Sequence, residues 1–324
     1  MAAEPEPGAT APLISIPEAA APAGAAAEWF EGPGGVRLRA ALFPAEPEVR
    51  GSVVLSPGRT EPLEKYFEVV RELNQRGFTV LAHDWRGQGL SQRLLPDRMR
   101  GHAVGYEGFL GDYRALLDAF SGRLPEPWIA FGHSMGACLT LLALVKGERR
   151  FAGAFLSAPM LAVTTRPWPA FIARAVVAAS LALGRGGDYA LPIYDPLADA
   201  FEIDRLTHDR PRYERYKAQL RACPDLAIGA LTWGWLDFAM KAGAEIARPG
   251  GLEAVETPVS IVAAGHDRLV LNDAALAAAR RLPNGSYLEL EAAYHEILME
   301  TDAIRADVWA DFDRLAATAI SPRA

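Results

Sequence analysis

The sequence predicts an α/β protein with a mostly parallel central sheet and helices on both of its faces. Three observations support this fold class. Short apolar runs such as residues 51–56 lack the alternation of a half-exposed strand, which is typical of strands buried on both faces. Segments with helical spacing, such as residues 62–76, separate these runs. The 324-residue chain, half of it hydrophobic, is long enough for a large core or for a core with an insertion.

Strand and helix patterns alternate along most of the chain. The first helix, residues 62–76, has apolar residues at helical spacing and ends before Gly77, a common residue just after a helix. An Ala-rich helix separates the last two strands. The expected strands are residues 36–43, 51–56, 78–82, 128–132, 152–157, 258–264 and 286–290, and the other expected helices are 106–120, 135–145 and 303–317.

The domain organisation follows from where this alternation fails. Residues 1–27 are rich in Ala, Pro and Glu, and we expect them to form a mobile tail. Residues 161–256 show helical patterns but no clear core strand. We expect them to form a mainly helical cap inserted over the C-terminal edge of the sheet, where such sheets bind ligands. The core then comprises residues 28–160 and 257–324.

Composition and charge argue against several classes of protein. A formal net charge of −7 gives no general attraction to nucleic acid, and no nucleic-acid-binding motif is present. Cys138 and Cys223 belong to no metal-binding or redox motif, which is typical of a reduced cytoplasmic protein. The N-terminal segment lacks the basic and apolar regions of a secretory signal, and the longest apolar stretch is too short to span a membrane. We therefore expect a cytoplasmic protein without a transmembrane segment.

The pentapeptide GHSMG at residues 132–136 is the strongest functional motif. It matches G-x-S-x-G, in which a serine occupies a sharp turn between a strand and a helix. An apolar strand pattern leads directly into the motif, and a helical pattern follows it. The helix N-terminus also places backbone N–H groups near developing negative charge. Ser134 is therefore the candidate nucleophile.

His295 is the candidate general base. In proteins with this turn, the acid and then the histidine follow the nucleophile along the chain. Two other histidines follow Ser134: His208 lies in a charged helical segment of the cap, and His266 precedes any acid placed at a late strand end. His295 follows the last expected strand after a short loop, where the catalytic histidine of such a sheet belongs.

Asp267 is the candidate acid. It follows the strand at residues 258–264, from where a carboxylate can reach the far nitrogen of His295 and hold its tautomer. Asp273 is the alternative, but its position fits the first turn of the next helix, where acids commonly act as caps. No metal site is expected, because Met299 occupies the second histidine position of the H-E-x-x-H motif that His295 would begin. No cofactor is expected either.

The loop at residues 56–61 is expected to supply part of an oxyanion hole. In this kind of site, one N–H comes from such a loop and another from the residue after the nucleophile. Arg59 is the expected loop donor, because Gly58 lets the backbone approach closely and Pro57 has no N–H. Met135 is the expected second donor.

Five segments carry a family resemblance. They are SPGRTEPLEKY (56–66), DWRGQGLSQR (84–93), GHSMG (132–136), GHDRLV (265–270) and YHEILME (294–300). From residue 28 onward the chain resembles the monoacylglycerol lipase and lysophospholipase branch of the α/β-hydrolases, and most of all its bacterial lysophospholipases. The resemblance implies the α/β-hydrolase fold and a triad of Ser134, Asp267 and His295. It also implies Arg59 and Met135 as oxyanion donors, although lipases of this branch often carry His-Gly where this chain has Pro-Gly.

The expected substrate is a small-molecule acyl ester with a single chain, a monoacylglycerol or a lysophospholipid. The apolar cap suits an acyl chain better than a charged amine. Trp168, Trp233 and Trp235 are candidate substrate-binding residues, although most cap aromatics are expected to form the cap's own core. A basic run at residues 205–221 suits either a lipid phosphate, an anionic membrane surface or a solvated helix face. Peripheral contact of the cap with a membrane is a further expectation.

Three functions remain open on the sequence alone. The first is serine carboxylic ester hydrolysis through an acyl-enzyme. The second is a serine aminopeptidase or acyltransferase on the same fold, and the peptidase needs an acidic amine-binding site in the cap. The third is a non-catalytic ligand-binding protein that keeps the fold, which the intact candidate triad disfavours.

Overall fold

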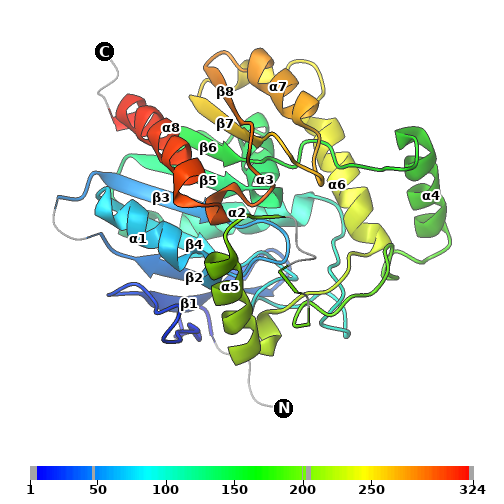
Figure 1. Cartoon of the computed structure of the whole chain (residues 1–324), viewed down its shortest axis with the longest axis horizontal. Coiled ribbons are helices and arrows are strands. Elements are labelled where there is room, and N and C mark those ends of the chain that lie inside the picture. Colours follow the sequence, from blue (N-terminus) through cyan, green and yellow to red (C-terminus); the bar gives the residue numbers. More distant parts are fainter. Residues whose placement is uncertain (1–5, 46–47, 199, 202–205, 321–324) are drawn as a thin grey trace.

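An eight-stranded sheet forms the centre of the computed structural model, which describes residues 6–45, 48–198, 200–201 and 206–320 (Figure 1). The strands are β1 (Ala26–Gly32), β2 (Val36–Phe43), β3 (Gly51–Ser56), β4 (Phe78–His83), β5 (Trp128–His133), β6 (Phe151–Ser157), β7 (Val259–Ala264) and β8 (Gly285–Leu290). Their order across the sheet is β1-β2-β4-β3-β5-β6-β7-β8. The strands from β3 to β8 run parallel, whereas β2 is antiparallel to both of its neighbours.

The sheet confirms the predicted mostly parallel α/β class. The expected strands are all present, with ends within one residue of their predicted positions. Strands β3, β4, β5 and β7 are buried along their whole length, which explains their continuous apolar sequences. β1 was not predicted, because its two large apolar residues, Trp29 and Phe30, are adjacent and show no clear alternation.

Helices cover both faces of the sheet, as predicted. On one face lie α2 (Glu107–Phe120), α3 (Met135–Val145) and α7 (Asn272–Arg281), whose buried side chains join one apolar cluster with the strands. On the other face lie α1 (Phe67–Gln75) and α8 (Asp302–Ile320), which belong to a second cluster. Helices α1, α2, α7 and α8 each bury one stripe, the usual pattern of a helix packed on a sheet, whereas α3 is apolar and buried on nearly all sides.

The described part of the N-terminal segment contacts the core and therefore differs from the expected mobile tail. The Gly8 N–H donates to the Trp29 carbonyl (2.7 Å), and the Ala11 N–H donates to the Ala27 carbonyl (2.9 Å). Both acceptors lie in β1, and Ala11 itself is buried. The composition suggested disorder because these residues bury little side-chain area. Backbone hydrogen bonds fix the segment instead, and composition does not reveal them.

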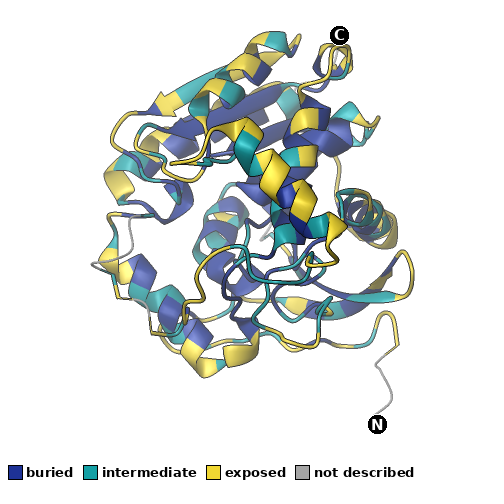
Figure 2. Ribbon diagram, turned by 90° about the vertical axis from the view of Figure 1, so that its right-hand side faces the viewer, coloured by how far each residue is buried: buried dark blue, intermediate teal, exposed yellow. Residues whose placement is uncertain are grey.

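In its described part, the chain between β6 and β7 contains three α-helices and no strand of the sheet. The helices are α4 (Ala170–Ala182), α5 (Arg210–Ala222) and α6 (Trp233–Ile246). Side chains cap two of them: Asp209 accepts the Arg212 N–H at the start of α5, and Thr232 accepts the Trp235 N–H at the start of α6. Figure 2 views the molecule from the side of α4 and shows buried strands behind a largely exposed helix.

Candidate active site

Ser134 lies on a sharp turn between β5 and α3. Its φ of 51° is in the left-handed region, which costs a residue other than glycine about 1–3 kcal/mol. Steric space explains the neighbouring glycines. A Cβ on Gly132 would lie 2.6 Å from the Ala137 Cα, and a Cβ on Gly136 would lie 2.1 Å from the Ser56 carbonyl oxygen. Both glycines are therefore required for the turn to form.

The structure brings the three predicted triad residues into one hydrogen-bonded chain. His295 Nε2 lies 2.9 Å from Ser134 Oγ, and His295 Nδ1 lies 2.6 Å from Asp267 Oδ2. Asp267 Oδ1 accepts the N–H groups of Leu269 (2.8 Å) and Val270 (3.0 Å), which fix the carboxylate. Because a carboxylate can only accept, Nδ1 carries the proton and Nε2 is free to take the proton of Ser134.

The topology of the sheet explains why residues so distant in sequence meet. Ser134 follows β5, Asp267 follows β7 and His295 follows β8, so all three lie at the C-terminal edge of parallel strands. Burial alone would raise the pKa of Asp267. The hydrogen bond and charge of His295, together with the two backbone N–H groups, hold that pKa below its ordinary value. Asp267 is therefore ionised at neutral pH.

The alternative residues lie elsewhere. Asp273 is exposed in the first turn of α7, as its sequence position predicted. His208 Nδ1 lies 2.8 Å from a Glu300 oxygen, and the His208 ring stacks on Tyr294 with centroids 3.9 Å apart. These contacts give His208 a structural role between the insertion and the start of α8. His266 lies in the loop after β7, near the same tyrosine.

The loop at residues 56–61 holds the N–H groups on either side of Arg59 in hydrogen bonds. The Gly58 N–H donates to Glu61 Oε2 (2.6 Å), and the Thr60 N–H donates to Gln88 Oε1 (2.6 Å). Between them, the Arg59 N–H has no acceptor in the described part of the chain. This pattern suits the predicted oxyanion donor, because its neighbours are fixed and its own N–H remains available.

Met135 presents the second predicted donor. It is the first residue of α3, so its N–H is among those that a helix leaves without an intrahelical acceptor. The helix dipole at this end favours negative charge. The turn at Ser134 and the loop at residues 56–61 are in close contact, because the missing side chain of Gly136 leaves room for the carbonyl oxygens of Ser56 and Pro57.

A buried charged cluster that the sequence analysis did not identify lies behind the loop at residues 56–61. Lys65 Nζ lies 2.7 Å from Glu61 and 2.6 Å from Glu296, the residue after the candidate base. The Tyr66 hydroxyl also donates to Glu61 (2.5 Å). Burial would raise the pKa of Glu61, but electrostatic interactions with Lys65 and His133 outweigh this effect and lower that pKa to about 2. Lys65 thus joins the loop at residues 56–61 to the loop of the candidate base.

A pocket of about 790 Å³ opens next to Ser134 and His295. All three predicted tryptophans line it: Trp168 is 57% exposed, Trp233 is partly buried, and Trp235 is 7% exposed and also belongs to the core. Most of the remaining lining is apolar and was not predicted, because it comes from loops and helix faces far apart in sequence. These residues include Met160, Val163, Val177, Leu191, Leu206, Leu231, Leu236, Met240, Leu269 and Val270.

Over the described ranges, no group of three or more His, Cys, Asp or Glu residues is placed to hold a metal ion. None of the helices in these ranges combines the length and the hydrophobicity that spanning a membrane requires. Cys138 is buried, Cys223 is partly buried, and neither forms a disulfide.

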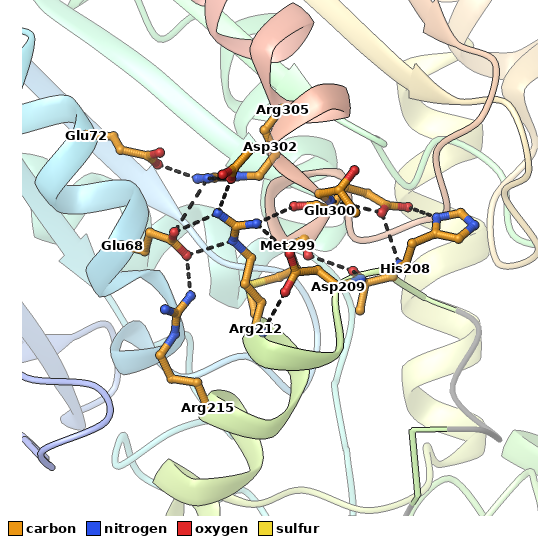
Figure 3. Close-up of polar contacts among 12 residues, drawn as sticks. Glu68, Glu72, His208, Asp209, Arg212, Arg215, Met299, Glu300, Asp302 and Arg305 are labelled. Carbon is orange, nitrogen blue, oxygen red and sulfur yellow. Dashed lines mark hydrogen bonds and ion pairs between the residues drawn. The ribbon is translucent and has the colours of Figure 1, made fainter.

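The basic run at residues 205–221 is largely engaged in ion pairs rather than free for a ligand (Figure 3). Arg212 lies 2.8 Å from both Glu68 and Asp209, and 2.5 Å from Asp302. Arg215 also pairs with Glu68. The run therefore fastens α5 to α1 and to the start of α8; its first residue, at position 205, lies outside the described residues.

Comparisons with known proteins identify a family and several relatives of this chain. A family model described as serine aminopeptidase, S33, matches residues 47–302. The lysophospholipase L2 of Escherichia coli strain K12 is 33% identical over 288 residues, which cover 86% of this chain and 83% of that protein. The monoacylglycerol lipase of Mycolicibacterium smegmatis is 27% identical and is matched over 74% of this chain and 79% of its own length.

Solved structures give the same fold. A monoglyceride lipase variant from Saccharomyces cerevisiae, in complex with a substrate analog, superposes with a TM-score of 0.67 at 19% identity, covering 91% of this chain and 95% of that one. A carboxyl esterase from Bacillus coagulans superposes with a TM-score of 0.69 at 18% identity, covering 92% and 99%. At these identities the likeness concerns the fold, and it confirms the predicted α/β-hydrolase architecture.

Proposed function

The chain belongs to the serine aminopeptidase S33 family of α/β-hydrolases, and from this premise we propose that it hydrolyses the ester of a single-chain glycerolipid. The membership confirms the resemblance found in the sequence. The relationship to lysophospholipase L2 and monoacylglycerol lipase identifies a serine ester hydrolase. We propose monoacylglycerols or lysophospholipids as its substrates, and Ser134, His295 and Asp267 as its catalytic triad.

One observation carries the proposal: a Ser–His–Asp hydrogen-bonded chain opens onto a largely apolar pocket. The 2.9 Å and 2.6 Å contacts of His295 give the geometry of a general base held by an acid. The volume of about 790 Å³ is within the usual range for small-molecule sites. Its walls of Val, Leu, Met and Trp suit one acyl chain.

The proposed reaction has two steps. His295 Nε2 takes the Ser134 hydroxyl proton while Oγ attacks the ester carbonyl carbon. The N–H groups of Arg59 and Met135 stabilise the oxyanion, and each such donor typically contributes about 10²–10³ in rate. When the intermediate collapses, His295 gives the proton to the leaving glycerol oxygen and the acyl group stays on Ser134. A water molecule, deprotonated by His295, then releases the fatty acid and restores Ser134.

The lining of the pocket favours an ester over an aminoacyl substrate, although the family model takes its description from aminopeptidases. An aminopeptidase needs a carboxylate for the free amine. Among the described lining residues, the carboxylates are Glu61 and Glu296, and both already pair with Lys65. An ammonium group would have to compete with that buried lysine, at a large desolvation cost.

We further propose that residues 161–256 act as a cap and that the cap makes peripheral contact with a lipid surface. Around the pocket mouth and on α4, large apolar side chains are exposed to solvent: Trp168, Phe171 at 73%, and Leu191. An exposed apolar patch of this kind is typical of an interaction site. Contact with a lipid surface would place the pocket mouth where single-chain lipids reside.

Labelling with a fluorophosphonate probe tests the nucleophile. We expect wild-type protein to label and Ser134→Ala to lose labelling while keeping its circular dichroism spectrum. Labelling of the Ala variant at the wild-type rate would mean that another residue is the nucleophile.

A substrate panel tests the reaction class. Monoacylglycerols, lysophospholipids, triacylglycerols and aminoacyl amides should be compared under matched conditions, and the single-chain lipids should be cleaved most efficiently. Efficient amide cleavage with negligible activity on both single-chain lipids would favour the aminopeptidase instead.

A further inference from the structure

The side chain of Arg59 brings an uncompensated positive charge to the pocket. Its Nη2 donates to the Gly229 carbonyl oxygen (2.5 Å), and the guanidinium lies 5.4 Å from the Trp235 ring centroid. Its Nε is buried without an acceptor. Over the described residues, no carboxylate pairs with it; its other polar neighbours are the uncharged hydroxyl groups of Tyr194 and Tyr216.

A buried cation without a counter-ion is unusual because the protein must bear its desolvation cost. Arg39 shows the ordinary solution: it is fully buried, whereas Arg59 is only partly buried, and it lies within 2.7 Å of Glu64 and within 2.6 Å of Asp84. Burial lowers the pKa of Arg59, yet a guanidinium does not lose its proton in proteins. The charge therefore persists, and an anionic ligand group would stabilise it.

We propose that the Arg59 side chain binds the phosphate of a lysophospholipid and selects this substrate over an uncharged monoacylglycerol. The inference rests on the proposed ester hydrolase function and concerns which single-chain lipid the site prefers. A guanidinium matches a phosphate well, because its planar donors form paired, charge-assisted hydrogen bonds.

The position of Arg59 suits this role. Its backbone N–H is the proposed oxyanion donor, while its side chain extends along the wall to Gly229 and Trp235. One residue can thus contact the ester carbonyl and, a short distance away, the headgroup. In a lysophospholipid only the glycerol lies between the acyl ester and the phosphate, a span comparable to the reach of an arginine side chain. The acyl chain would then occupy the apolar lining.

The test compares two substrates with the same acyl chain, 1-oleoylglycerol and 1-oleoyl lysophosphatidylglycerol, in mixed micelles of a neutral detergent. The readout is the ratio of their kcat/KM values. A loss of catalytic efficiency that affects both substrates equally therefore leaves this ratio unchanged. Arg59→Met keeps the backbone N–H but removes the charge. We expect it to lower the lysophospholipid-to-monoacylglycerol ratio by about 10- to 100-fold, the usual worth of a hydrogen bond to a charged group. Arg59→Lys should lower the ratio less, because it keeps the charge but loses the planar donors.

Arg166 provides the matched control. It also lines the pocket, but it is exposed, so it would act only through diffuse attraction of an anion. A smaller drop for Arg166→Met than for Arg59→Met supports a specific phosphate contact. Equal drops, or no change in the ratio for Arg59→Met, would overturn the assignment. If wild-type protein cleaves neither substrate, the proposed function fails instead, so the two failures are distinguishable.

A measurement on the wild type keeps the proposal testable even if the Arg59 variants do not fold. Two uncleavable ether analogues of equal chain length, a 1-O-alkylglycerol and its phosphoglycerol derivative, would compete with p-nitrophenyl butyrate. We expect the phosphate-bearing analogue to inhibit at least about tenfold more strongly at equal micelle composition. Equal inhibition by both analogues would contradict the proposal.

Discussion

The two sides of the pocket are held by different forces. One side, which we call the floor, consists of the loop at residues 56–61 and the triad, and buried polar groups with defined partners fix it. The other side, the roof, consists of α4 and the loop before it. Of the thirteen residues of α4, only Val177 and Ser180 are buried. Local opening of the roof is therefore expected to cost less free energy than local opening of the floor, as is usual for weakly packed elements.

The insertion itself contains both kinds of region. Helix α5 is fastened to α1 and α8 through Arg212 and Arg215, whereas α4 packs mainly on α6 (Figures 1 and 3). The difference indicates that the insertion has a fixed part and a loosely held part. The loosely held part carries the exposed apolar side chains next to the pocket.

The largest effect is expected in the floor, from loss of the triad. Asp267→Asn should lower kcat by about 10⁴-fold, because an amide no longer holds the required tautomer of His295. His295→Ala should cost at least as much. Asp273→Asn is the matched control and should change kcat by less than about twofold, because Asp273 is exposed in α7. The opposite ranking of the two Asp variants would transfer the role of the acid to Asp273.

The next effect concerns the stability of the floor and its dependence on pH. Glu61→Gln removes one of the two carboxylates that pair with the buried Lys65. It should therefore lower the free energy of unfolding at pH 7 by about 3 kcal/mol. In the wild type the folded-state pKa of Glu61 is lowered to about 2. Its stabilisation is therefore complete above the ordinary value near 4.5 and is lost as the pH falls toward 2.

Urea unfolding at pH 7 and pH 3 measures this effect. The difference between wild type and Glu61→Gln should shrink at pH 3, because the wild type has then lost part of its advantage. Lys241→Met, which removes an exposed ion pair with Asp237, is the control and should stay within about 1 kcal/mol of wild type at both pH values. A difference that does not change with pH would show that the charge of Glu61 is not what stabilises the floor.

A smaller effect is expected in α5. Arg212→Met removes ion pairs to Glu68, Asp209 and Asp302 and should destabilise the protein by about 1–3 kcal/mol. The value is limited because Asp302 is largely exposed and screened by water. Arg221→Met, on the same helix and paired only at 3.9 Å with Glu214, should change stability by less than about 1 kcal/mol. Equal values for the two variants in thermal unfolding would mean that ion pairs do not fasten α5.

The floor was largely predictable from sequence because local chain geometry determines it. The G-x-S-x-G turn requires its glycines for steric reasons, and Asp267 and His295 follow predicted strands whose C-terminal ends meet at one edge. These features are encoded within a few residues of each site. The strand pattern therefore indicated both the sheet and the positions of the candidate triad.

The other features of the site and of the fold depend on contacts between distant segments, which no local pattern encodes. Lys65 and Glu296 are separated by 231 positions, so their ion pair could not be read from either sequence segment alone. The same applies to the basic run, where a pattern typical of a solvated face proved to be paired with α1 and α8. The first strand was missed because its two large apolar residues are adjacent and show no alternation, and the N-terminal segment was missed because backbone hydrogen bonds fix it.

The smallest effect is expected in the roof and separates lipid contact from catalysis. Phe171 is exposed on α4, so Phe171→Gln should leave stability unchanged but weaken contact with a lipid surface. We expect a loss of about three- to tenfold in activity on monoacylglycerol in vesicles, because partial burial of one aromatic side chain contributes about 1 kcal/mol. Activity on a dissolved short-chain p-nitrophenyl ester should change little, since that substrate requires no surface. Val49→Gln is the matched control: Val49 is similarly apolar and exposed, but it precedes β3, at the edge of the sheet opposite the pocket. Equal losses for both variants, or equal losses on both substrates, would contradict a lipid contact through α4.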